Sequence, residues 1–402
     1  MKLYADKIVF SSNNVKEKSS LVIESKVDSP QLQDIIFEKA IIYPALINTH
    51  DHLVGNWYPP AITEDKFVNS HIWVEAMKNH PTYLARNEYW KNDGSFILTK
   101  QKEITLCWLG VYKNIFSGVV AVQDHAPKQK PAYYQTFPVN VVEDFTQCHS
   151  LPLDNWWGGK SAEEEFEDAM GKMPFILHVG EGVDPLTAHE FTELKERGLL
   201  AKNTVMIHGI CLSEKEIEEI AEVGATICWC PTSNENLIGK HLNIEYCLKQ
   251  GVNVTLATDS TLSGGINLFA EMRFSKERFP RVTSVDIFKM VTCNAAQALM
   301  LPNQYGSLEK STSELLILDE VIDNPFDNLI YAQTANIKLL LHDNKPILGD
   351  IDYFPLFSVD KQNYTTFKSG NREKFVIGDF RKHTDYINSF LTYHKKFPYL
   401  PE

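Results

Sequence analysis

The pattern of apolar and polar residues divides the chain into a long central part and two shorter ends. In the central part, short apolar runs alternate with segments of helical periodicity. Uninterrupted apolar runs of this length are typical of strands that are buried on both faces. Strands that alternate with helices predict a parallel sheet covered by helices, either a barrel or a doubly wound open sheet. The runs cover residues 45–49, 118–123, 139–142, 175–179, 205–208, 225–230 and 252–258.

Helical periodicity fills several of the gaps between these runs, at residues 161–171, 213–223 and 244–250. Two of these segments begin with a serine that is followed three residues later by a glutamate, Ser161 with Glu164 and Ser213 with Glu216. In such a capping box the two side chains bond to backbone amides that the first helical turn leaves free. The pattern therefore predicts helix starts at both serines.

The two ends of the chain differ from the central part because they predict short strands. Residues 3–10 and 20–25 precede the first apolar run, and residues 315–318 and 337–341 follow the last one. A helix is predicted around residues 381–393. We expect the two ends to pair into a small β-domain beside one long α/β body.

Composition excludes several classes of function. The chain has 402 residues, a formal net charge of −13 and no dense basic run, which argues against a nucleic-acid partner. No apolar stretch approaches the roughly 18 residues that span a membrane, and the first residues lack the features of a secretory signal. The 7 scattered cysteines are typical of reduced, buried thiols. We expect a cytoplasmic protein without a membrane partner. The sequence leaves open whether the protein forms a homo-oligomer.

Ionisable residues stand at the ends of four predicted strands. His50 and His52 close the first apolar run, His178 and His208 close two later runs, and Asp259 follows the last. Residues two apart on a strand point to the same face, so His50 and His52 can reach one ion. Taken alone, His178 or His208 is better explained as a satisfied core histidine. The carboxyl ends of parallel strands form the edge where such folds place their sites, so the whole set predicts a metal site.

The residue types fit one divalent ion. Imidazole and carboxylate ligands suit Zn²⁺, and also Fe²⁺ or Mn²⁺. Such an ion lowers the pKa of a bound water from about 15.7 towards about 7, which gives hydroxide at neutral pH. A glutamate close by can protonate a leaving group. Glu181 lies three residues after His178 and would face away on a straight strand, but Gly180 lets the chain fold it back.

Four segments, in chain order, carry a family resemblance. The run from Pro44 to Leu53 resembles the first-strand signature of the amidohydrolase superfamily. His178-Val179-Gly180-Glu181 is similar to the His-x-x-Glu of the branch that contains triazine, guanine and cytosine deaminases. Cys230-Pro231-Thr232-Ser233-Asn234 and Ala257-Thr258-Asp259-Ser260 resemble the seventh- and eighth-strand segments of that branch. The resemblance extends to about residue 352, with Ala45 where the family usually has glycine.

The resemblance implies a distorted (β/α)8 TIM barrel with a small composite β-sandwich domain built from both chain ends. The implied sandwich halves are residues 1–43 and 305–352, the metal-dependent barrel is 44–304, and 353–402 is a partly helical C-terminal extension. The sequence itself indicates only seven barrel strands. Either a short strand lies near residues 145–150, or the barrel is irregular there.

The family resemblance implies that three catalytic side chains act beside one divalent ion. Glu181 would move a proton, His208 would orient the hydroxide or polarise the substrate, and Asp259 would also act as the base. No lysine stands at the strand end where two-metal relatives carry a carboxylated one, so a mononuclear site is expected, with zinc favoured over iron or manganese. The implied metal ligands are His50, His52, His178 and Asp259.

Substrate contacts are predicted from aromatic residues and histidines around the strand ends. They are Trp57, His125, His149 and Trp156. The tryptophans either stack on a planar ligand or plug the top of the barrel. His125 is equally well explained as a packing or capping residue.

These observations predict a metal-dependent hydrolase in which metal-bound hydroxide attacks an sp² carbon and cleaves a C–N bond of a small-molecule substrate. The branch resemblance favours deamination of an aminated heterocycle over hydrolysis of a cyclic or other amide. A catalytically inactive scaffold related to these hydrolases is the alternative from a different class. The presence of every expected ligand argues against the scaffold.

Overall fold

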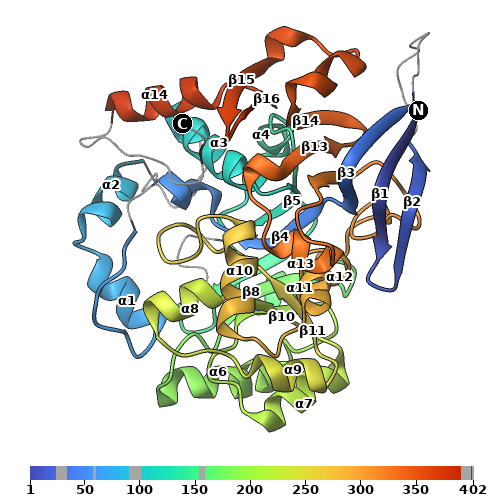
Figure 1. Ribbon diagram of the computed structural model, residues 1–402. Coiled ribbons are helices and arrows are strands. Elements are labelled where there is room, and N and C mark those ends of the chain that lie inside the picture. Colours follow the sequence, from blue (N-terminus) through green and yellow to red (C-terminus); the bar gives the residue numbers. More distant parts are fainter. Residues whose placement is uncertain (24–33, 58–59, 90–100, 154–158, 391–399, 401–402) are drawn as a thin grey trace.

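The computed structural model describes residues 1–23, 34–57, 60–89, 101–153, 159–390 and 400. Within these residues the protein is a mixed α/β structure, as the sequence predicted (Figure 1). Two parallel sheets carry the central part of the chain, and a third, mixed sheet is built from both chain ends. No helix in the described ranges is long and apolar enough to cross a lipid bilayer.

The apolar runs of the central part form parallel strands. One sheet has the order β4-β5-β6, and the other has the order β11-β10-β9-β8-β7. Every pairing within these two sheets is parallel. The strands are β4 (Leu46–Asp51), β5 (Val119–Asp124), β6 (Asn140–Val141), β7 (Thr146–Ser150), β8 (Phe175–Val179), β9 (Thr204–His208), β10 (Thr226–Trp229) and β11 (Asn253–Leu256).

The strand β7 lies in the region that the sequence left open. It pairs with β8, so a short strand is present in the 145–150 region. Among the strands that the structure describes, no ladder joins β6 to β7 or β11 to β4. The segment after β11 nevertheless reaches β4, because the Asp259 amide donates to the His50 carbonyl over 3.2 Å. This hydrogen bond brings the first and last strands of the series together.

Helices connect the parallel strands. Both predicted capping boxes are present, at Ser161 with Glu164 and at Ser213 with Glu216. The helices that they begin, α5 and α7, confirm two of the predicted helical segments, and α9 confirms the third. The helices are α1 (Ser70–Met77), α2 (Pro81–Tyr89), α3 (Gln101–Ile115), α4 (Pro131–Tyr134), α5 (Ala162–Ala169), α6 (Pro185–Glu196), α7 (Glu214–Val223), α8 (Pro231–Leu237), α9 (Ile244–Lys249), α10 (Leu268–Arg278), α11 (Ser284–Met290), α12 (Cys293–Ala298), α13 (Pro325–Ile330) and α14 (Phe380–Phe390).

Both chain ends contribute to the mixed sheet, whose order is β15-β16-β14-β13-β12-β3-β1-β2. The two ends meet where β3 pairs antiparallel with β12. Sequence reasoning missed β3, in which Glu38 and Lys39 interrupt the apolar positions. The strand predicted at 20–25 starts earlier, as β2, and residues 24–25 lie outside the described ranges. The strands are β1 (Lys2–Ser11), β2 (Asn14–Val22), β3 (Ile35–Pro44), β12 (Leu315–Asp319), β13 (Ile337–His342), β14 (Lys345–Asp350), β15 (Tyr364–Ser369) and β16 (Arg372–Ile377).

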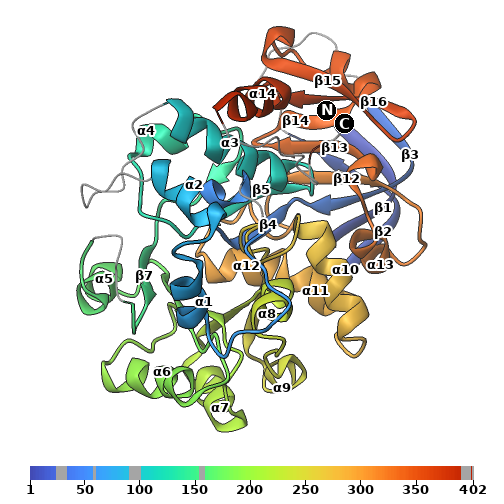
Figure 2. The ribbon, with the colours of Figure 1, turned by 90° about the vertical axis from the view of Figure 1, so that its left-hand side faces the viewer.

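The C-terminal helix α14 packs on α3, the helix that precedes β5. Figures 1 and 2 both show the two helices side by side. Phe380 is buried against Phe116, with ring centroids 5.6 Å apart. Further along α14, His383 stacks on Trp108 at 5.1 Å. The tail therefore supports α3, which carries a buried lysine, Lys113, toward the centre of the molecule.

Replacing Phe380 with alanine is expected to lower the free energy of unfolding by about 3 kcal/mol, because the change removes buried contacts and leaves a cavity. Urea unfolding followed by circular dichroism measures this loss. Lys382→Ala, at an exposed position of the same helix, is the matched control and should change the free energy by less than about 0.5 kcal/mol. Equal effects of the two variants would contradict the packing of α14 on α3.

Candidate active site

Polar side chains from four strands of the two parallel sheets converge at their carboxyl ends. Ligand atoms of His50, His178 and His208 lie within 4.8 Å of one another, and those of His50, His52 and Asp259 do the same. The two groups share His50, so they mark one centre. The structure thus brings together all the residues that the sequence singled out as metal ligands, and His208 with them.

Hydrogen bonds fix which ring nitrogen two of these histidines turn toward the centre. His178 Nδ1 donates to the carbonyl of His149 over 2.7 Å, and His208 Nδ1 donates to Asn234 Oδ1 over 2.8 Å. Both acceptors are oxygens, so the proton sits on Nδ1 and the Nε2 lone pair stays available. Histidines that ligate metals are held in this way by an oxygen at the other ring nitrogen.

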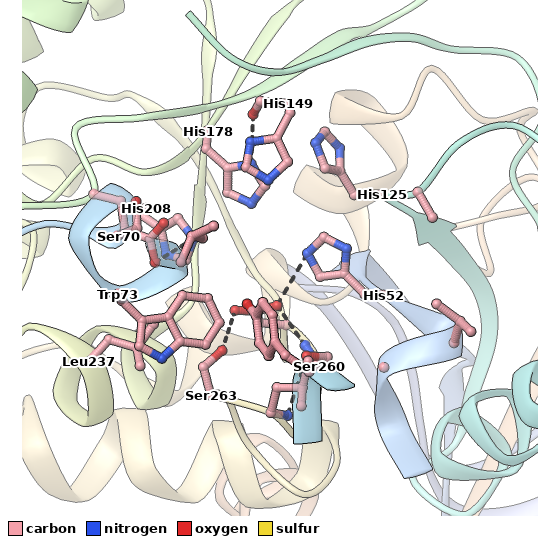
Figure 3. Close-up of a pocket in the computed structure, with 18 residues that line it drawn as sticks. His52, Ser70, Trp73, His125, His149, His178, His208, Leu237, Ser260 and Ser263 are labelled. Atoms are coloured by element: carbon pink, nitrogen blue, oxygen red, sulfur yellow. Dashed lines mark hydrogen bonds and ion pairs between the residues drawn. The ribbon is translucent and has the colours of Figure 1, made fainter. Parts of the chain in front are cut away.

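The Asp259 carboxylate is held by short hydrogen bonds. Its Oδ1 accepts from the Ser260 amide over 2.6 Å, and its Oδ2 accepts from the hydroxyls of Ser233 and Ser263 over 2.9 Å each. Oδ1 also lies 3.5 Å from His52 Nε2 (Figure 3). Burial by itself would raise the pKa of Asp259, but the neighbouring histidines and these hydrogen bonds bring it below its usual value. The group is therefore ionised at neutral pH.

His50 gives the clearest sign that a cation fits here. Its side chain is fully buried, and neither ring nitrogen has a hydrogen-bond partner among the described residues. A buried imidazole without partners is costly, and a metal–nitrogen bond would remove that cost. Burial, together with the neighbouring histidines, lowers the pKa of His50 and His178 well below the usual value, so both rings are neutral and can ligate. Neutral imidazoles with an ionised carboxylate are donors that suit a divalent ion.

Glu181 folds back over the centre by the route that the sequence predicted. Gly180 has a φ of +68°, which turns the chain out of β8, and Glu181 Oε1 comes to 3.3 Å from His208 Nε2. Burial raises the pKa of Glu181, and His208 offsets this only in part. A carboxyl group with a raised pKa is suited to carry a proton near neutral pH.

Two of the converging residues have a strained backbone. His208 has a φ of +76° and Asp259 a φ of +54°, although neither is a glycine. Such conformations cost about 1–3 kcal/mol each and cluster at functional sites. In this molecule they occur where a strand end must turn a side chain into the centre.

A buried ion pair lies beneath the centre. Lys113 of α3 and Asp51 of β4 are both fully buried, with Lys113 Nζ 3.3 Å from Asp51 Oδ2. Lys113 Nζ also donates to the Asp259 carbonyl over 2.6 Å and to Asn56 Oδ1 over 3.0 Å. Asn114 donates to Asp51 over 3.0 Å. Asp51 therefore belongs to this polar network.

The centre opens into a cavity of about 110 Å³. Figure 3 shows Trp73 and Leu237 on one side of the cavity and His125 and His149 on another. Trp73 comes from α1, and Tyr83 of α2 packs edge-on against it, with ring centroids 5.8 Å apart. None of the described residues that line the cavity is a lysine or an arginine.

Two of the four predicted substrate contacts, His125 and His149, line this cavity. Trp57 does not line it: the residue is fully buried in the 3-10 helix η1 (Leu53–Trp57) and belongs to the hydrophobic core. The structure therefore corrects this expectation in favour of the packing role. Trp156 lies outside the described residues.

Sequence reasoning missed the wall that α1 and α2 contribute. Trp73 and Tyr83 belong to no motif, and helical periodicity indicates only that one face is covered. Ser233 and Asn234 lie in a segment that resembled the family, but the sequence assigned them no role. Their contacts reveal that they hold Asp259 and His208.

Comparison with known proteins agrees with this arrangement. Residues 157–347 match the model of the amidohydrolase family. The match covers just under half of the chain, which in this part resembles the amidohydrolase family. The matched residues include His178, Glu181, His208 and Asp259, while His50 and His52 lie before them.

Several curated relatives are deaminases. The chain is 38% identical over 185 residues to a 5-methylthioadenosine/S-adenosylhomocysteine deaminase of Pyrococcus abyssi. This alignment covers 42% of each protein. It is also 31% identical over 150 residues to guanine deaminase of Mus musculus. That alignment covers 34% of this chain and 33% of the relative. The chain thus spans less than half the length of these curated relatives.

A solved structure shares the fold of this chain. It is an adenosine deaminase from Xanthomonas campestris with bound zinc. The TM-score is 0.68 at 16% identity, and the match covers 90% of this chain and 95% of that one. At this identity the similarity describes the fold.

Lys113→Met is expected to lower the free energy of unfolding by about 3–5 kcal/mol, because it leaves the Asp51 carboxylate buried without its partner. The double variant Asp51→Asn/Lys113→Met should lose less, since neither charge then remains. Urea unfolding of the wild type and both variants measures the difference. A double variant that is less stable than the single one would contradict this account of the ion pair.

Proposed function

We propose that this protein is a metal-dependent hydrolase that removes an amino group from a small aminated heterocycle. The observation that carries the proposal is the convergence of buried histidines and Asp259 around His50, with Glu181 beside them. Such donors hold a divalent ion, and the nearby carboxyl group provides the proton donor that cleavage of a C–N bond needs.

One divalent ion, zinc in this proposal, would be held by His50, His52, His178 and Asp259. When bound there, the ion supplies an activated water at neutral pH. Asp259, whose lowered pKa keeps it ionised and which serine hydroxyls hold in place, would accept a proton from the attacking water. Glu181 delivers a proton to the departing nitrogen. His208, 3.3 Å from Glu181, orients the atom under attack.

The cavity favours an uncharged, planar substrate. Trp73 offers a flat face for stacking, and apolar side chains such as Val54 and Leu262 line the walls. An anionic group would meet the carboxylates of Glu181 and Asp259, with no lysine or arginine among the described lining residues to pair with it. Amide hydrolysis would use the same residues. We favour deamination because the relatives from Pyrococcus abyssi and Mus musculus are deaminases.

We also propose that the central strands close into a distorted (β/α)8 barrel and that the mixed sheet forms part of a composite β-sandwich domain. The hydrogen bond from Asp259 to His50 and the fold shared with the adenosine deaminase support the barrel. The zinc in that structure supports the choice of metal. Proposed domain limits are 1–43 and 305–352 for the sandwich, 44–304 for the barrel and 353–402 for the extension. A cytoplasmic location and a homo-oligomer stay proposals from the sequence.

An ammonia-release screen tests the function. The zinc-supplied protein is offered guanine, adenine, cytosine, melamine and 5′-methylthioadenosine, with a cyclic amide assayed in parallel for ring opening. We expect ammonia from at least one amine, and Asp259→Asn should lower that rate at least about a thousandfold because the base is lost. Asp385→Asn, an exposed carboxylate change, is the matched control. Ring opening without ammonia release would reject deamination, and near-normal turnover by Asp259→Asn would reject the base.

Glu181→Gln should lower kcat by about 10²–10⁴-fold, because an amide has no proton of suitable acidity for the leaving nitrogen. Steady-state kinetics on the compound found in the screen measure this, and metal analysis shows whether the ion is retained. Glu196→Gln, an exposed change on α6, should leave kcat unaltered. A kcat for Glu181→Gln within threefold of the wild type would exclude the proton-transfer role.

A further inference from the structure

The first turn of α8 carries two residues that hold side chains of the centre in place. Ser233 donates to the Asp259 carboxylate over 2.9 Å, and Asn234 Oδ1 accepts from the His208 ring over 2.8 Å. Ser233 and Asn234 are both fully buried. The position of this turn therefore decides where the Asp259 carboxylate and the His208 ring point.

A side chain from another helix holds this turn. The helix α8 starts with Pro231, which has no amide hydrogen, and the side chain of its N-cap residue, Cys230, makes no capping hydrogen bond. The next amide, that of Thr232, donates instead to Glu271 Oε1 of α10 over 2.8 Å. Glu271 lies 39 positions further along the chain, and α10 packs against α8. A distant carboxyl group thus satisfies an amide that the first helical turn leaves free.

The same carboxyl group also lies against the loop that follows Asp259. A Cβ on Gly265 would lie 2.1 Å from Glu271 Oε2, so any larger residue there would displace the carboxyl group. The Gly265 amide donates to the Thr258 carbonyl over 3.1 Å, and a Cβ on Gly264 would lie 2.0 Å from that carbonyl oxygen. The loop therefore folds back tightly on the residue before Asp259. Glu271 lies between this loop and the first turn of α8.

Glu271 is a fully buried carboxyl group that the proposed reaction does not use. Its Oε2 has no hydrogen-bond partner among the described residues, and burial raises the pKa of Glu271 to about 7. A buried polar atom without a partner is costly. Carboxyl groups perturbed in this way cluster at functional sites. A role in holding the two segments together accounts for the cost.

We propose that Glu271 is a positioning residue that fixes the first turn of α8 and thereby sets the Asp259 carboxylate and the His208 ring for the reaction. The kinetic consequence rests on the proposed function, while the positioning itself can be tested without a substrate. Thr232 transmits the restraint, because it directly precedes the two residues that contact the centre. Loss of the acceptor should therefore disturb both contacts, whereas a weakening of α10 elsewhere should disturb neither.

Crystal structures of the wild type, Glu271→Met and Glu271→Gln, each with zinc supplied, test the positioning directly. Methionine fills a similar volume without a comparable acceptor, so the hydrogen bonds from the turn to Asp259 and His208 should lengthen beyond about 3.5 Å or occupy two conformers. Glutamine keeps a side-chain oxygen and should keep both bonds. Two intact bonds in Glu271→Met, each in a single conformer, would overturn the proposal.

A variant on the donor side gives the same test if Glu271→Met does not fold. Thr232→Pro removes the amide hydrogen and leaves the carboxyl group in place, and proline is tolerated in the first turn of a helix. The bonds to Asp259 and His208 should loosen in this variant as well. Unchanged bonds in a folded Thr232→Pro variant would contradict the role of the Thr232 amide and overturn the proposal.

Kinetics on the most active compound of the screen provide a further test. Glu271→Met should lower kcat about tenfold, as loss of an outer support of a metal centre does, with KM changed less than about threefold. Glu271→Gln should keep kcat within about threefold of the wild type. The matched control is Ser275→Ala. Ser275 is buried on the same helix and donates to the Glu271 carbonyl over 2.8 Å, so this change weakens α10 but keeps the carboxyl group, and kcat should stay within about threefold.

An equal fall of kcat in Glu271→Met and Ser275→Ala, or a rise of KM alone, would assign Glu271 a merely structural role and overturn the proposal. Absence of turnover in the wild type would instead count against the proposed function. The crystal structures would still decide whether Glu271 positions the first turn of α8.

Discussion

The arrangement of charge at the carboxyl ends of the parallel strands is the constraint on which the rest of the structure depends. Asp259 is ionised and nearly fully buried, while burial keeps His50 and His178 neutral. The nearby lysine, Lys113, is already paired with Asp51 and touches only the backbone carbonyl of Asp259. The carboxylate and the imidazole lone pairs therefore lack a compensating cation among the described residues, and a divalent ion meets that need.

Several layers of the molecule serve this centre. Serine hydroxyls and the Asn234 amide orient Asp259 and His208, so the ligand atoms are set before an ion binds. Beneath them, Lys113 ties α3 to the Asp259 loop, and the C-terminal helix packs on α3 from outside. Above them, α1 brings Trp73 and Ser70 to the cavity. In the proposed mechanism, the residues for substrate recognition and for proton transfer therefore lie around one set of strand ends.

Much of the centre could be predicted from sequence because parallel strands place their carboxyl ends together. That rule alone gathered His50, His178, His208 and Asp259, and the freedom of Gly180 accounted for Glu181. Periodicity could not find β3 or the wall from α1, since neither has a regular apolar pattern or a motif. It also could not tell that η1 turns Trp57 into the core, because exposure of an aromatic residue is decided by packing.

Metal binding tests the central claim most directly. The protein is stripped with a chelator, dialysed and titrated with Zn²⁺ by calorimetry, with bound metal counted by mass spectrometry and thermal stability followed in parallel. The account predicts about one equivalent of zinc and a higher Tm for the wild type, with both effects lost in His50→Asn. Uptake well below one equivalent by the folded wild type, or undiminished binding by His50→Asn, would contradict it.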